Sequence, residues 1–201
     1  MTVRYAVLAL ALATPALARP ADDLNAVKTH LQSARTMTAA FSQTDRKGQV
    51  LDGTLTIRQP GQIRFAYGRG VPKTVVADGK TLYFVDYQVR QVSRWPIRNS
   101  PLAAILDPAR DIGRYATLMP VADDRIVSVQ IYSKSRPEYG KINLVFTRQA
   151  GAPGGLSLSG WVALDAQGNR TTVRLSNQRY NVPVSDEAFR WDDPRKKPAS
   201  R

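Results

Sequence analysis

Few side chains in this sequence are of the types that carry out covalent chemistry. His30 is the single histidine and there is no cysteine, so a Ser-His-Asp arrangement would have to use His30 as its base. The residues around His30 have the periodicity of an amphipathic helix, whereas a catalytic base is expected in a loop at a strand end. We therefore expect no catalytic residues and no enzyme, and a hydrolase is the more distant alternative.

The acidic residues are poorly placed for metal binding or for paired acid and base catalysis. Asp123 and Asp124 are adjacent, and adjacent side chains in strands or loops diverge. The segment 165–169 resembles the start of a calcium loop, but it lacks the later acidic ligands and fits a hairpin turn. The sequence has neither a phosphate-binding glycine loop nor a nucleophile elbow. We expect no metal and no cofactor.

The first eighteen residues have the layout of a secretory signal peptide. Arg4 supplies a positive charge, an apolar stretch runs to Thr14, and small residues follow up to Ala18. No other apolar run is long enough to span a bilayer, and the absence of cysteine leaves no thiol to be lipidated. The sequence predicts a signal peptide at 1–18, one soluble exported domain at 19–194 and a basic mobile tail at 195–201.

The chain is strongly basic, with 29 Lys and Arg residues against 16 Asp and Glu residues, a net charge of +13. Such a charge favours anionic partners. Nucleic acid is not expected, because the chain is exported and its basic residues are scattered instead of clustered on one helix with stacking aromatics. Membrane headgroups or an acidic partner protein are better candidates. A basic surface that serves only solubility is equally compatible.

The periodicity predicts one amphipathic helix followed by many strands. Asp22 can cap the helix, whose apolar face would be Leu24, Val27, Leu31 and Ala34. Alternating apolar residues and turn formers then predict antiparallel strands. The expected strands lie at 37–41, 55–57, 63–67, 74–77, 81–85, 89–95, 125–132, 141–147, 156–165 and 170–178. Phe189 and Trp191 are expected to anchor the chain after the last strand.

One segment interrupts the strands. Ser100 can cap a short helix with Pro101 in its first turn, and residues 111–118 are expected to add another turn. The apolar face of this helix would be Leu102, Ile105 and Leu106. A sheet of ten to eleven strands must curl to avoid open edges. We therefore predict a mainly β chain with a few helices (α+β), built as a strongly curved antiparallel sheet or incomplete β-barrel with a helical lid over an apolar cavity.

Several short motifs, none distinctive alone, occur in the order found in one family. They are Phe41-Ser-Gln43, the runs 53–61, 63–67 and 76–84, Ser100-Pro101-Leu102, Asp165 with Gly168 and Thr171, and Phe189-Arg-Trp191 with Pro194. Together they cover nearly the whole mature chain, which resembles the periplasmic outer-membrane lipoprotein carrier family.

The resemblance implies a soluble, monomeric periplasmic carrier of triacylated lipoproteins. Such a carrier takes acyl chains from an inner-membrane ABC exporter and delivers them to an outer-membrane receptor or to the membrane itself. The receptor has a similar fold but is anchored through a cysteine, which this chain lacks. The residues expected to face the acyl chains are Leu55, Ile57, Ile63, Phe65, Tyr67, Leu82 and Phe84. For each of them, a place in an ordinary filled core is the alternative. The alternative is a periplasmic module of the same fold that binds or senses a glycolipid or another hydrophobic ligand.

Two further sites are expected, a latch that the resemblance implies and a contact loop that combines charge with an apolar residue. The family commonly has an Arg directly before Pro60 that hydrogen-bonds the lid, where this chain has Gln59, with Arg58 one residue earlier. Because successive strand residues face opposite sides, Arg58 can replace it only through a bulge or register shift, and Gln59 would be a weaker latch than a charged donor. The loop with Arg69, Val71 and Lys73 is the expected membrane or receptor contact. A solvated hairpin loop is the alternative for that segment.

Overall fold

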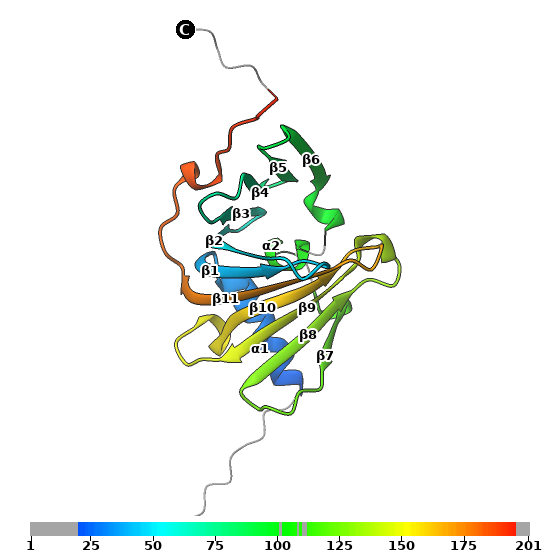
Figure 1. Ribbon diagram of the computed structural model, residues 1–201. Helices are drawn as coiled ribbons and strands as arrows, with labels where there is room; N and C mark the ends of the chain where they lie inside the picture. Colours follow the sequence, from blue (N-terminus) through cyan, green and yellow to red (C-terminus); the bar gives the residue numbers. More distant parts are fainter. Residues whose placement is uncertain (1–19, 101, 108, 110–111, 196–201) are drawn as a thin grey trace, which may run out of the picture.

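The computed structural model describes residues 20–100, 102–107, 109 and 112–195, and within them eleven strands form one antiparallel sheet (Figure 1). The strand order is β6-β5-β4-β3-β2-β1-β11-β10-β9-β8-β7. The strands are β1 (Thr36–Thr44), β2 (Val50–Arg58), β3 (Gln62–Tyr67), β4 (Lys73–Asp78), β5 (Thr81–Asp86), β6 (Gln91–Pro96), β7 (Ala116–Met119), β8 (Ile126–Tyr132), β9 (Lys141–Arg148), β10 (Leu156–Leu164) and β11 (Arg170–Tyr180). The expectation of a mainly β, antiparallel chain with few helices is confirmed. The expected signal peptide and all of the tail except Arg195 lie outside the described residues.

Two α-helices accompany the sheet, α1 (Pro20–Ser33) and α2 (Ala103–Leu106). Asp22 lies inside the first turn of α1 and does not cap it, because Pro20 is already helical. The Ser100 hydroxyl accepts a hydrogen bond from the backbone N–H of Leu102 at 3.1 Å, just before α2. Short 3-10 turns lie at Ile97–Asn99, Ile112–Arg114, Pro137–Tyr139, Pro153–Gly155 and Asp186–Phe189.

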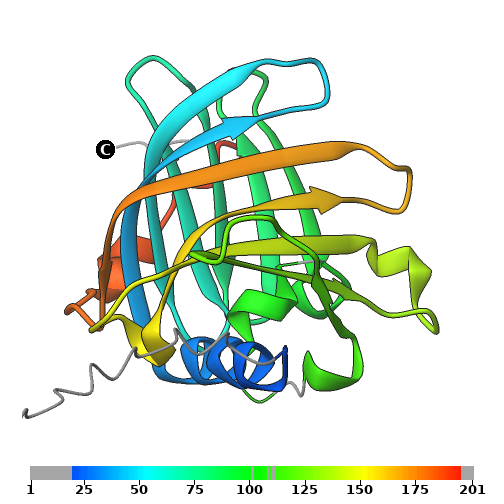
Figure 2. The same cartoon turned by 90° about the horizontal axis from the view of Figure 1, so that it is seen from below.

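The sheet bends around its interior. Phe65 on β3 and Trp161 on β10 are four strand steps apart, which in a flat sheet would separate them by roughly 19 Å. Their ring centroids are instead 6.1 Å apart. Figure 2 shows the strands arching over α2, with α1 across one end. The edge strands β6 and β7 do not pair with each other, so the sheet is open.

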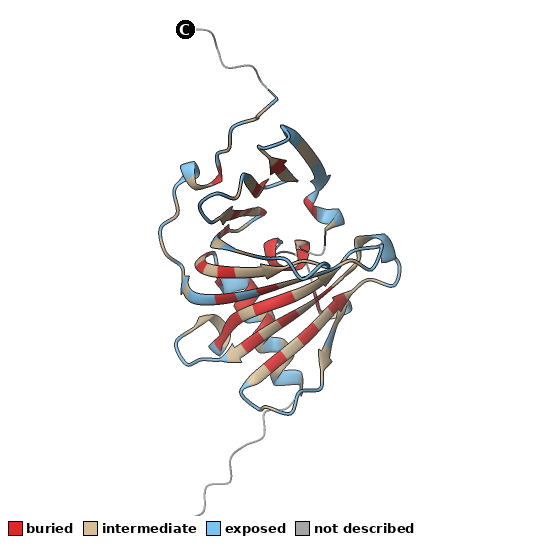
Figure 3. Ribbon diagram, viewed as in Figure 1, coloured by how far each residue is buried: buried red, intermediate tan, exposed pale blue. Residues whose placement is uncertain are grey.

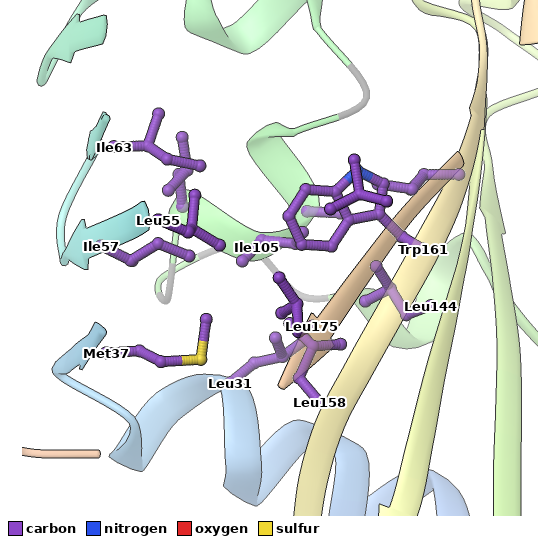
Figure 4. Packing of buried hydrophobic residues seen from close by; sticks show 14 of the residues in the cluster. Leu31, Met37, Leu55, Ile57, Ile63, Ile105, Leu144, Leu158, Trp161 and Leu175 are labelled. Atoms are coloured by element: carbon purple, nitrogen blue, oxygen red, sulfur yellow. The ribbon is translucent and has the colours of Figure 1, made fainter. Parts of the chain in front are cut away.

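The core lies on the concave face of the sheet. Alternate residues of each strand point inward, which gives the bands of buried residues in Figure 3. Residues from β1, β2, β8, β9 and β10 meet α1 and α2 in one apolar cluster. Figure 4 shows Leu31 of α1 and Ile105 of α2 among the inward side chains Met37, Leu55 and Ile57.

The segment after α2 differs from the expectation of a helical turn at 111–118. Only Ile112–Arg114 forms a 3-10 turn, and the chain then enters strand β7. Ala116 and Leu118 pair with Ile131 and Val129 of β8. Two inward residues are too few to establish a strand period in the sequence, so only the partner strand reveals β7.

Residues 181–195, here called the C-terminal strap, cross the convex face of the sheet. Arg58 pairs with Asp186 at 2.5 Å, and its guanidinium lies 5.0 Å from the ring centroid of Phe189. The Trp191 ring lies 5.1 Å from that of Tyr83. Phe189 and Trp191 thus anchor the strap, as their apolar character predicted.

His30 joins α1 to the start of β10. Its Nδ1 lies 3.0 Å from the Pro153 carbonyl oxygen and 2.8 Å from that of Leu156. The imidazole is 2% exposed and has edge contacts with Phe146 and Tyr180. Burial lowers the pKa of His30 below 6.5, and the two carbonyl hydrogen bonds partly oppose this effect. The histidine therefore holds α1 against the start of β10.

Stability should depend on pH through His30 in the range just below neutrality. Because the pKa of His30 is lowered by folding, its contribution is complete above pH 6.5 and is lost as the pH falls below that value. Urea unfolding at a series of pH values should show this loss in the wild type. His30→Gln, which keeps a side-chain donor but cannot titrate, should remove the slope just below pH 6.5, whatever its own stability, and should leave the slope that the carboxylates cause at lower pH. The same slope in both proteins would contradict the assignment.

Candidate functional site

A hollow of about 250 Å³ lies inside the bent sheet. Most of its wall is apolar, and the loop residues Asp165 and Asn169 supply polar groups. It is lined by Gln43, Phe65, Tyr67, Val75, Phe84, Ser100, Leu102, Trp161, Ala163, Asp165, Asn169, Thr171 and Val173. We call this space the inner hollow. Such a combination of apolar walls and a few polar groups is typical of sites for hydrophobic ligands.

Two sets of neighbouring strands position the walls. Phe65, Val75 and Phe84 are successive cross-strand partners on β3, β4 and β5, so their side chains share the inward face. Trp161 and Val173 are partners on β10 and β11 and form the opposite wall. The bend of the sheet brings these two walls face to face, and neither would be a site in a flat sheet.

Of the wall residues that the structure describes, Asp165 is the only one in the inner hollow with an acidic or basic side chain. The Tyr67 hydroxyl donates a hydrogen bond to Gln43 Oε1 at 3.1 Å. Burial raises the pKa of Tyr67 to about 12, although the hydrogen bond to Gln43 acts in the other direction, so the phenol is neutral at physiological pH. Within the described ranges, no cluster of His, Cys, Asp and Glu could hold a metal ion.

The expected acyl-binding residues divide into two groups. Phe65, Tyr67 and Phe84 line the inner hollow. Leu55, Ile57 and Ile63 are at most 2% exposed, and with Leu82 they belong to the same core cluster as α2. These four residues are not part of the wall of the hollow. Alternation showed correctly which side chains face inward, but not which part of the interior the protein fills with its own side chains.

The expected lid residues are mostly inside the protein. Leu102 lines the inner hollow, whereas Ile105 and Leu106 are buried in the core. Figure 4 shows Ile105 next to Leu55 and Ile57. In this structure α2 thus fills one end of the concave space, and of the three expected lid residues only Leu102 reaches the hollow.

Gln59 contacts α2, and Arg58 does not. Gln59 Nε2 donates hydrogen bonds to the carbonyl oxygens of Ile105 at 3.0 Å and Leu31 at 2.8 Å, while its buried Oε1 has no partner. The backbone N–H of Gly61 donates to the Leu106 carbonyl at 2.8 Å. Arg58 lies on the convex face and donates to the strap instead. No bulge turns it inward, since β2 pairs with β3 in regular register up to Arg58.

The loop 68–72 follows Tyr67 of the wall, at the end of the sheet that also carries the loop 165–169, and this end is here called the open end of the inner hollow. Arg69 is exposed and Val71 is half-buried. Lys73, at the start of β4, forms an ion pair with Asp86 at 3.7 Å. Of the two expected cationic contacts, Arg69 is therefore the more accessible.

The apolar wall residues that were not predicted as site residues are Val75, Trp161, Ala163 and Val173. Val75 lies within an expected strand and faces the side opposite to its buried neighbour Val76. Strand alternation could therefore have identified Val75 as an inward residue. Trp161 and Ala163 were hidden by a bulge, where the pairing of β10 with β9 shifts register between Leu158 and Gly160. The bulge changes which residues of β10 point inward.

Comparison with known proteins identifies the family of this chain. Residues 32–192 match the family model described as "Outer membrane lipoprotein carrier protein LolA". The chain is 30% identical to an outer-membrane lipoprotein carrier protein of Xanthomonas axonopodis pv. citri, covering 94% of this chain and 92% of that one. It is 27% identical to the outer-membrane lipoprotein carrier protein of Cupriavidus taiwanensis, covering 92% of this chain and 89% of that one.

A solved structure of a DUF1329 family protein from Desulfovibrio piger has a similar fold. Its TM-score is 0.53 at 12% identity, over 85% of this chain and 96% of that one. Among the described helices, none combines the length and apolar character needed to cross a bilayer. The family match covers both walls of the inner hollow, Gln59 and α2. This chain therefore belongs to the outer membrane lipoprotein carrier protein LolA family.

Proposed function

We propose that this carrier shields the acyl chains of its lipoprotein cargo in the inner hollow, between the Phe65 and Trp161 walls. The family consists of periplasmic lipoprotein carriers that are transport proteins and not enzymes. A triacylated N-terminus exposes about 40 methylenes to water, which at about 0.8 kcal/mol each amounts to roughly 30 kcal/mol. The observation that carries the proposal is the apolar hollow between two walls that only the bend of the sheet brings together.

The inner hollow has to enlarge to hold such cargo. Its volume of about 250 Å³ is below the roughly 300–1,000 Å³ of sites for drug-sized ligands, and three acyl chains are larger than those ligands. The parts best placed to move are Leu102 and α2, which are attached to β2 and the following turn by few hydrogen bonds. With α2 moved out of the interior, the open, bent sheet would act as an incomplete barrel with α2 as its helical lid.

Gln59 would then act as the latch of this lid. Gln59→Leu removes both hydrogen bonds and leaves the buried carbonyls of Leu31 and Ile105 without this donor. We expect a loss of about 1–3 kcal/mol in the free energy of unfolding and faster uptake and release of a triacylated lipopeptide. Stopped-flow fluorescence checks the rates. Gln32→Leu, at an exposed position of α1, is the control, and equal rates in the two variants would argue against a latch.

The route of the cargo completes the proposal. Signal peptide 1–18 directs export of the soluble, monomeric domain 19–194 with its basic tail 195–201. An inner-membrane ABC exporter supplies the lipoprotein, and an outer-membrane receptor or the membrane itself accepts it. Arg69, Val71 and Lys73 are the proposed contact on one side of the open end. Their position in and beside the loop 68–72 supports this role.

The test is to isolate the exported protein from cells without detergent and to identify what accompanies it. Mass spectrometry should find triacylated N-terminal peptides of lipoproteins in a one-to-one complex. Free glycolipid or another free lipid in their place would favour a hydrophobic-ligand binding module of the same fold and would contradict acyl-chain transport.

A further inference from the structure

A second hollow, here called the arginine hollow, lies on the convex side of the sheet beside the first. It has a volume of about 590 Å³ and is formed where the hairpin loops 45–49 and 165–169 lie next to each other. Its lining residues are Thr44, Asp45, Arg46, Gly48, Gly168, Asn169, Arg170, Thr172 and Arg174. Asn169 belongs to both hollows, so the arginine hollow borders the opening of the acyl site.

The cations of the arginine hollow are available to a ligand. Arg170 and Arg174 are exposed and form no ion pair or side-chain hydrogen bond with any residue that the structure describes. Arg170, Thr172 and Arg174 alternate along β11 and so share one face, with about 13 Å between the two arginine Cα atoms. Arg46 is held at the rim by a 3.3 Å hydrogen bond from its Nη1 to Asn169 Oδ1.

Hydroxyl groups lie between these cations. Thr44 and Thr172 are direct partners on β1 and β11, and both line the arginine hollow. The one carboxylate in the lining, Asp45, accepts hydrogen bonds from the backbone N–H groups of Lys47 and Gln49 through Oδ1. Guanidinium forks together with hydroxyl donors match the oxygen geometry of a phosphate group.

The end of the molecule that carries the arginine hollow is also the more basic one. The five loops at this end, 45–49, 68–72, 87–90, 133–140 and 165–169, contain six basic and three acidic residues. The described loops and turns at the opposite end, 59–61, 79–80, 97–100, 102–107, 109, 112–115, 120–125 and 149–155, contain four basic and three acidic residues. An anionic surface would therefore meet the open end of the inner hollow first.

We propose that the arginine hollow binds the phosphate groups of anionic phospholipids and so holds the open end of the acyl site against a bilayer. The choice of a bilayer as the source of the phosphate rests on the proposed function, since acyl chains leave and enter membranes. Arg170 and Arg174 bind the phosphate oxygens, Thr44 and Thr172 donate from between them, and Arg46 closes the rim.

Sedimentation with lipid vesicles tests this site. Wild-type protein should bind vesicles of phosphatidylethanolamine and phosphatidylglycerol and should not bind vesicles of phosphatidylcholine. Arg170→Gln with Arg174→Gln should weaken the binding about thirtyfold, as expected for two cations that contact an anionic surface. Arg94→Gln with Arg179→Gln removes the same charge from exposed positions outside the hollow and should have less than about a threefold effect.

The outcomes separate the possible ligands. Equal losses of vesicle binding in the two double variants would overturn the proposal. Absence of wild-type binding to anionic vesicles would also overturn it and would favour an acidic protein partner. Complete release by millimolar inorganic phosphate at constant ionic strength would overturn the bilayer as the source. Lipopeptide binding without vesicles should be unchanged in Arg170→Gln with Arg174→Gln. If wild type binds anionic vesicles through these arginines but binds no lipopeptide, the proposed function fails and the phosphate site stands.

Discussion

Replacement of Ala163 by Trp is expected to weaken the binding of a triacylated lipopeptide about a hundredfold or more. Ala163 lines the inner hollow two residues after Trp161 on the same inward face of β10. An indole at this position would occupy space that the acyl chains need. Exclusion of four methylenes alone, at about 0.8 kcal/mol each, accounts for about 3 kcal/mol, or about a hundredfold in affinity. Titration of a fluorescent lipopeptide without detergent measures the loss.

The matched control is the same substitution on the other face of the sheet. Ala40 is half-buried on β1 opposite Ser176, between the inward residues Ala39 and Phe41. Ala40→Trp should therefore leave lipopeptide affinity within about threefold of wild type, since its side chain points away from the core. Similar affinities for Ala163→Trp and wild type, with both proteins folded, would mean that the acyl chains bind elsewhere.

Trp161→Ala is expected to lower the free energy of unfolding by about 3–5 kcal/mol. Trp161 is 2% exposed and touches Phe65 across the bend, so its removal opens a cavity between the two halves of the sheet. Trp95→Ala is the matched control, because Trp95 is 48% exposed on the edge strand β6. Its replacement should lower the free energy of unfolding by less than about 1 kcal/mol. Urea unfolding measures both. Equal costs would contradict the central position of Trp161.

Much of the fold can be predicted from the sequence because its strands alternate regularly. Met37, Ala39 and Phe41 face inward as their spacing indicates. Turn formers such as Pro60-Gly61 mark the hairpins, and both Gly61 and the partner turn residue Gly79 adopt positive φ where their backbones approach closely. The pairing of β1 with β11, more than 120 residues apart along the chain, has no local signal and follows only from the complete sheet.

The site was less predictable than the fold, for two physical reasons. Extrapolation of alternation from Leu156 and Leu158 would place Trp161 on the outside, but the bulge before Gly160 reverses the faces. Gly160 has a φ of 150°, and a Cβ there would lie 2.2 Å from the Val173 carbonyl oxygen, so the close approach of β11 requires glycine. The second reason is packing. Whether Leu55 lines a cavity or contacts α2 depends on where residues about 50 positions later return to the sheet.

The three tryptophans allow the central claim to be tested directly. Trp161 lies in the wall of the inner hollow, Trp95 on the exposed edge strand and Trp191 on the strap. A lipopeptide with brominated acyl chains quenches only indoles that it contacts. In Trp95→Phe with Trp191→Phe, the remaining Trp161 should be strongly quenched, whereas Trp161→Phe should show little quenching. Quenching of Trp95 or Trp191 with no effect on Trp161 would show that the acyl chains do not enter the bent sheet.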